Sequence, residues 1–89
     1  MSKGFTDVAR AFSEIESQDE MEGFLSEILT DSEREQLSLR WELMKQLRSG
    51  KSQRAISSDL HISLCKVTRG SKILKNEKSI TNKIMNRRG

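Results

Sequence analysis

Proline and tyrosine are absent from this 89-residue chain, which has one cysteine, one histidine and one tryptophan. The single cysteine, Cys65, excludes an internal disulfide, and no Cys/His cluster has the spacing of metal ligands, so we expect no bound metal. Only 34% of the residues are hydrophobic. A domain this short buries roughly 60% of its unfolded surface and is marginally stable alone. Oligomerisation is therefore the remaining way to enlarge the core.

Long apolar runs are also missing. No stretch approaches the roughly 18 apolar residues of a membrane span. The N-terminal sequence MSKGFTDVAR lacks the apolar core of a signal peptide. We therefore expect a cytoplasmic protein with no membrane partner. The chain has no nucleophile–base pair, carboxylate pair, phosphate-binding glycine loop or metal cluster, so we expect no catalytic residues and no enzymatic activity.

Charge is divided unevenly along the chain. Residues 1–35 carry 3 basic and 10 acidic side chains, a net of −7, whereas residues 36–89 carry 13 basic and 3 acidic ones, a net of +10. The basic part suits a polyanion such as nucleic acid. A solvated, lysine-rich surface would have the same composition, so charge alone leaves both interpretations open.

Apolar spacing predicts helices along most of the chain. Residues 5–15 and 19–29 are expected to form two short amphipathic helices whose Phe and Met side chains are core or dimer contacts. A third helix is expected over residues 31–49, and its wide apolar stripe indicates burial against more than one neighbour. Gly50 then stands where a C-terminal glycine cap is expected. The tail, residues 76–89, is expected to form a last short helix with a basic end.

Residues with side-chain oxygens stand at three of the expected helix starts. Thr30 and Glu33 fit a capping box, in which each side chain accepts from the other residue's backbone N–H. Ser52 and Ser63 are expected to cap a fourth and a fifth helix in the same chemical way. The boundaries of these three helices are therefore the best specified in the sequence.

The stretch SQRAISSDLHISLCKVTR has the layout of a helix-turn-helix, in which two short, steeply crossing helices share a small core. The apolar residues that such a core requires are Ile56, Leu60, Ile62 and Val67. Ser57 is a small residue where the two helices pass closest. His61 stands in the turn where glycine is usual, and histidine is enriched among residues with positive φ. In such motifs the second helix enters the major groove of DNA, although a hairpin in a protein-binding adaptor would share this spacing.

The segment over residues 29–75 resembles the tryptophan repressor family over about half of the chain. The most specific motifs are LTxxER, SQR at the start of the fourth helix and TRGS in the fifth. The resemblance implies an all-α, Trp-repressor-like fold with a helix-turn-helix, in which two chains intertwine as a homodimer. The expected organisation is a single domain with dimerisation helices over residues 1–50, a helix-turn-helix over 52–72, and a C-terminal helix and basic tail over 73–89.

The same resemblance implies a repressor that binds operator DNA with L-tryptophan as co-repressor and controls genes of tryptophan biosynthesis or transport. The positions matching the family's ligand site are Arg40, Arg69, Gly70, Leu29, Thr30 and Ile73. Guanidinium groups can stack on an indole and pair with a carboxylate, and a glycine lets a ligand approach the backbone. Leu29 and Thr30 match a segment whose backbone holds the ligand's amino group from the other subunit. Without a ligand, Arg40 would instead be a surface partner of Glu33 or Glu42, and Gly70 a weak point of its helix.

The positions that match the family's DNA contacts are Gln53, Arg54, Leu64, Cys65, Lys66 and Thr68. Lys72 and Lys75 are expected to add phosphate contacts, and so is Arg34 at the start of the third helix. Gln53 and Arg54 are expected to bind phosphates, and Cys65 is interpreted as a small residue facing the groove. Lys66 replaces a threonine of the best-known member, so we expect a different base preference.

Departures from the family pattern keep two alternatives open. The linker Gly50–Ser52 is one residue shorter than in typical members and resembles in length a sister group of Trp-repressor-like proteins. The N-terminal helix is short, and the C-terminal helix is truncated. The first alternative is therefore a helix-turn-helix regulator with a different ligand or none, and the second is a helical protein–protein adaptor.

Overall fold

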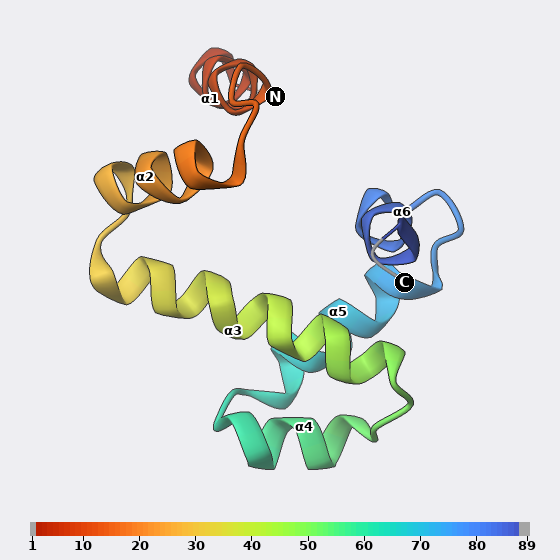
Figure 1. The fold of residues 1–89 in the computed structure, drawn as a ribbon. Helices are drawn as coiled ribbons and strands as arrows, with labels where there is room; N and C mark the ends of the chain where they lie inside the picture. The colour runs from red at the N-terminus through yellow and green to blue at the C-terminus, as the bar shows by residue number, and fades with distance from the viewer. Residues whose placement is uncertain (1, 88–89) are drawn as a thin grey trace. The chain divides into compact units, whose positions relative to one another are not determined.

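The computed structural model describes residues 2–87 of the chain, and this part contains helices and no strand (Figure 1). In chain order the elements are α1 (Lys3–Ser13), α2 (Gln18–Ile28), α3 (Asp31–Arg48), α4 (Gln53–Leu60), α5 (Leu64–Lys75) and α6 (Ile80–Arg87). The all-α fold class is thereby confirmed. The end of the predicted basic tail, Arg88 and Gly89, lies outside the described residues.

The chain divides into two compact units, Met1–Glu35 and Gln36–Gly89. In the first unit neither α1 nor α2 has a buried residue. The rings of Phe12 and Phe24 meet edge to face with their centroids 5.2 Å apart, a favourable geometry for an aromatic pair. The other apolar side chains of the two helices are half-buried or exposed, so the described residues of this unit contain no buried core.

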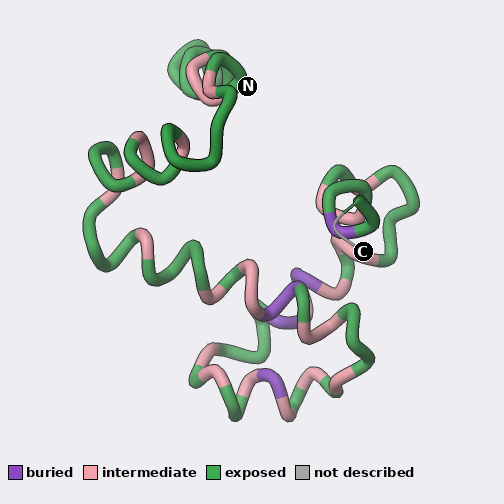
Figure 2. The backbone as a smooth tube through the Cα atoms, in the orientation of Figure 1, coloured by how far each residue is buried: buried purple, intermediate pink, exposed green. Residues whose placement is uncertain are grey.

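The second unit contains the buried core, and the purple segments of Figure 2 all belong to α3, α4, α5 and α6. Its buried hydrophobic residues are Leu43, Met44, Ile56, Val67 and Met85. Ile56 and Val67 are fully buried, with 0% of their surface exposed, where α4 packs on α5. Leu60 and Ile62 are half-buried against this core. The four apolar positions predicted for the helix-turn-helix therefore form its core.

The turn of the helix-turn-helix has the predicted strained residue. His61 adopts φ 55° and ψ 45°, the left-handed region, and ends α4 as its C-cap. The Ser57 hydroxyl donates to the carbonyl of Ile62 over 2.6 Å, which fixes the chain as it leaves the turn. Ser63 then caps α5 by accepting from the backbone N–H of Lys66. These contacts orient α5 relative to α4.

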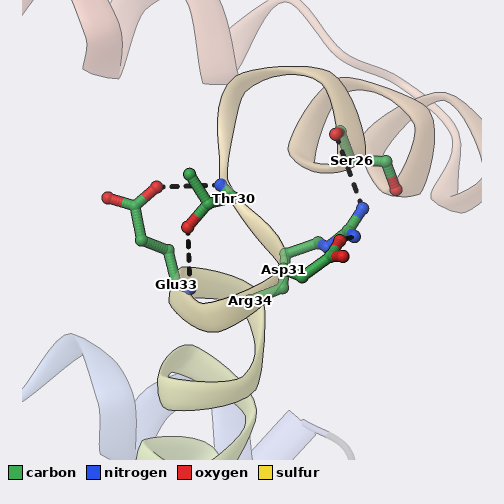
Figure 3. Close-up of polar contacts among 5 residues, drawn as sticks. All are labelled: Ser26, Thr30, Asp31, Glu33 and Arg34. Carbon is green, nitrogen blue, oxygen red and sulfur yellow. Dashed lines mark hydrogen bonds and ion pairs between the residues drawn. The ribbon is translucent and has the colours of Figure 1, made fainter.

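The other predicted caps are also present. The hydroxyl of Ser52 accepts from the N–H of Ala55 at the start of α4, and Gly50, beyond the end of α3, has a φ of 92°. At the start of α3 the N–H of Thr30 donates to Glu33 Oε1 over 2.8 Å, and the N–H of Glu33 donates to Thr30 Oγ1 over 3.1 Å (Figure 3). The capping box is thus formed in both directions.

The C-terminal helix α6 packs on α5. Met85 is buried, and the side-chain amide of Asn82 donates to the carbonyl of Leu74 over 2.6 Å. No helix among residues 2–87 is long and apolar enough to cross a bilayer. Within the same residues no group of three or more His, Cys, Asp or Glu side chains is placed to hold a metal ion.

Candidate nucleic-acid interface and ligand cavity

The helix α5 presents two different faces, because residues three and four apart in a helix share a side. Val67 points into the core. The outward face borders a shallow hollow lined by Leu64, Cys65, Thr68, Arg69 and Lys72. The face toward α3 borders a cavity that contains Lys66, Arg69, Gly70 and Ile73 in its wall. Arg69 lines both hollows.

The outward face of α5 is suited to contact DNA. Leu64 is 43% exposed, and Cys65, Arg69 and Lys72 are exposed as well. Cys65 is a free thiol. The N-terminal turns of a helix presented in this way can enter the major groove while the preceding helix lies across the backbone. Arg54 and Lys75 are also exposed in this unit, where they are available for phosphates.

Thr68 is half-buried, and it contacts a residue of the preceding helix. Its hydroxyl donates to Gln53 Oε1 over 2.9 Å, so two predicted DNA contacts are joined across the helix-turn-helix. The NH₂ group of the Gln53 amide remains available to donate to a phosphate. The spacing of the motif in the sequence gave no indication of this pair.

Arg34 belongs to the other unit, Met1–Glu35. Its guanidinium pairs with the carboxylate of Asp31 and also donates to the carbonyl of Ser26 over 3.4 Å (Figure 3). The predicted phosphate contact of Arg34 would therefore be made by a side chain that already joins the end of α2 to the start of α3.

The cavity between α3 and α5 has a volume of about 470 Å³, which is within the usual range for small-molecule sites. The residues lining it are Arg40, Leu43, Met44, Lys66, Arg69, Gly70 and Ile73. Four of the six predicted ligand residues, Arg40, Arg69, Gly70 and Ile73, are thus brought together. The other two, Leu29 and Thr30, belong to the Met1–Glu35 unit, where the hydroxyl and the N–H of Thr30 bond to Glu33.

Gly70 has a packing role that the sequence did not reveal. It is buried, and a Cβ atom added there would lie 2.7 Å from Leu43 Cδ1, 3.0 Å from Met44 Sδ and 3.1 Å from Leu47 Cδ1. The missing side chain therefore allows α5 to approach α3 closely beside the cavity. The interpretation of Gly70 as merely a weak point of the helix does not account for these distances.

Positive charge is concentrated at the cavity. Three cationic side chains, Arg40, Lys66 and Arg69, line it together with apolar residues, and no acidic residue is among the lining. Among the described residues of the Gln36–Gly89 unit Arg40 forms no ion pair, and Glu42 pairs with Lys45 instead, with its Oε1 3.6 Å from Lys45 Nζ. Such a wall suits a ligand with an apolar body and an acidic group.

Sequence reasoning placed Lys66 with the DNA contacts and did not foresee Leu43 and Met44 in the cavity wall. The place of Lys66 in the cavity wall could have been predicted from the sequence, because residues 66, 69, 70 and 73 follow the i, i+3, i+4, i+7 spacing of one helix face. The contribution of Leu43 and Met44 could not be separated from their role in the core, since both are buried there.

A known protein family matches nearly the whole chain. The sequence model of a family described as Trp repressor protein matches residues 3–88. The match includes α1 and α6, which lie outside the segment that carries the resemblance in the sequence. No curated protein and no solved structure matches the chain.

Proposed function

The chain belongs to the Trp repressor family, a family of DNA-binding transcriptional regulators, and we propose that it is a repressor activated by L-tryptophan. It would act in the cytoplasm as a homodimer on operators of tryptophan biosynthesis or transport genes. The observation that carries the proposal is the position of α5, whose outward face is exposed and basic while its other face lines a cavity with cationic walls.

DNA binding in this proposal follows from the helix-turn-helix. The start of α5 enters the major groove, and Gln53 and Arg54 at the start of α4 bind the backbone. Lys72 and Lys75 add phosphate contacts from the last turn of α5, where both are basic residues of the exposed surface. Because each neutralised phosphate releases counterions, the affinity should fall steeply with salt.

Ligand binding would use the cavity beside α5. The indole of L-tryptophan would lie on the apolar side chains of Leu43 and Ile73, with the guanidinium groups of Arg40 and Arg69 available for stacking and for the carboxylate. Tryptophan would raise operator affinity only if it binds the DNA-competent arrangement of α5 better than the alternative one.

A homodimer would complete the Met1–Glu35 unit. Neither α1 nor α2 buries a residue, and Phe5, Val8 and Ile28 are exposed. Burial of apolar area stabilises by about 25 cal/mol per Å², so covering these faces with a second copy would supply the core that this unit lacks. Leu29 and Thr30 would then reach the ligand of the partner chain, as the resemblance implies.

The test is fluorescence anisotropy with duplex DNA selected by the protein from a random pool, measured at about 50 and 200 mM salt, where phosphate contacts have large effects. We expect Arg54→Ala to weaken binding and to reduce its salt dependence. Lys45→Ala is the matched control, because Lys45 lies on α3 beside Glu42 and outside the proposed interface. A helical adaptor would show no DNA binding for any of the three proteins.

The co-repressor is tested separately, by calorimetric titration of L-tryptophan and by its effect on DNA affinity. Absence of heat together with unchanged DNA affinity would remove the co-repressor and leave the DNA-binding regulator standing. The second candidate is then a regulator of this fold with another ligand or none, which the short linker Gly50–Ser52 favours. A thermal-shift screen of aromatic metabolites would identify such a ligand.

A further inference from the structure

We propose that Lys66 binds the acidic group of the ligand, together with Arg69, and so makes the cavity selective for aromatic acids over aromatic amines. The inference rests on the proposed function, because it concerns the ligand that occupies the cavity beside α5. It departs from the prediction for Lys66, which was a DNA contact.

Lys66 lies on the side of α5 that faces the cavity. It lines the cavity of about 470 Å³ with Arg69, and also a small adjoining hollow with Gln36 and Leu39 of α3. It does not line the outward hollow that contains Lys72. Both hollows that include Lys66 therefore lie on the α3 side of α5, which is the side of the cavity.

Among the described residues, the surroundings of Lys66 lack negative charge. Within residues 2–87 neither Lys66 nor Arg69 forms an ion pair, and no acidic residue lines either hollow. A ligand with an acidic group would supply the missing negative charge, whereas a ligand amine would add a further positive charge. Like charges close together are unfavourable even near the surface, and opposite charges are attracted.

Lys66 and Arg69 are placed so that both can reach one acidic group. Lys66 and Arg69 are separated by three positions, so their side chains start from the same side of the helix. A carboxylate has two oxygens, each able to accept from one cation, while the apolar body of the ligand lies toward Met44 and Ile73. The ammonium of Lys66 is a compact donor that can follow such a group, and the guanidinium of Arg69 can also stack on the ring.

The experiment is calorimetric titration of the full chain with three probes that share one ring system: L-tryptophan, indole-3-propionate, which has the acid alone, and tryptamine, which has the amine alone. We expect tryptamine to bind most weakly to the unaltered protein. Lys66→Gln should weaken binding of both acids by up to about fivefold, the upper end of the range for an exposed charge pair, without weakening that of tryptamine. Lys66→Arg should restore acid binding.

Lys72→Gln is the matched control, because it removes a lysine from the same helix on the face away from the cavity. It should weaken DNA binding and leave the affinity for all three probes unchanged. Equal affinities of the unaltered protein and Lys66→Gln for the acids would overturn the role of Lys66 while keeping the ligand cavity. No binding of any probe to the unaltered protein would overturn both that role and the proposed ligand.

Discussion

Replacing Gly70 with alanine tests the close approach of α5 to α3. Two effects oppose each other in Gly70→Ala. Alanine in a helix interior is favoured over glycine by about 1 kcal/mol. The added methyl would, however, lie 2.7 Å from Leu43 Cδ1 and 3.0 Å from Met44 Sδ, which is closer than carbon and sulfur atoms approach without repulsion.

The size of the repulsion follows from the burial of these neighbours. Leu43 is 3% exposed and Met44 is 8% exposed, so moving their side chains would disturb the core that they form with Ile56 and Val67. Adding a methylene to a packed core costs about 1–3 kcal/mol. After subtracting the gain in helix propensity, we expect Gly70→Ala to lower the free energy of unfolding by about 1 kcal/mol. For a domain of this size that corresponds to a fall in Tm of about 4–8 °C.

The measurement is urea denaturation at one fixed protein concentration, since the stability of an oligomer depends on concentration. Gly23→Ala is the matched control. Gly23 lies inside α2, and a Cβ atom there would meet nothing within 4 Å in this chain. Gly23→Ala should therefore raise the free energy of unfolding by up to about 1 kcal/mol through helix propensity. If Gly70→Ala raised the free energy of unfolding as much as Gly23→Ala, the packing role of Gly70 would be refuted.

Three further changes probe other contacts. Thr68→Val removes the hydroxyl that donates to Gln53 and should weaken DNA binding by roughly 2- to 10-fold, as expected for one hydrogen bond; Thr68→Ser should retain binding in the same anisotropy assay, and equal losses would exclude this role. His61→Gly relieves the left-handed backbone at φ 55° and should raise the free energy of unfolding by up to about 1 kcal/mol, whereas a decrease would show another role for the imidazole. Thr30→Ala removes the cap of α3 and should cost about 1 kcal/mol in denaturation, a loss that Thr30→Ser should avoid.

The helices and their ends were largely predictable because their signals are local. Ser52 and Ser63 cap the helices that they were expected to start, and His61 has the backbone conformation that its place in the turn required. Such features depend on residues within one turn of the chain. Helix caps and positions with positive φ favour particular residue types, which can be recognised in the sequence. The burial of Ile56 and Val67 was predictable for the same reason, because the helix-turn-helix motif requires apolar residues at these positions.

The site was predictable only in part, because its geometry depends on contacts between helices. The family resemblance identified Arg40 and Arg69, which line one cavity. It did not reveal the bond between Thr68 and Gln53, which joins residues of two helices. Nor did it reveal that Gly70 touches side chains of α3. Contacts of this kind depend on how the helices pack, and a pattern along one helix does not contain that information.

Under the proposed function, regulation through α5 needs no long pathway, because the proposed ligand site and DNA site lie on the same helix. Arg69 lines the cavity and also the outward hollow, and the residues of the two faces alternate along α5. A helix moves as a rigid element over such a length, so a ligand that shifts the cavity face also shifts the face toward DNA. Coupling between the two sites then requires only that α5 has two positions with different ligand affinities.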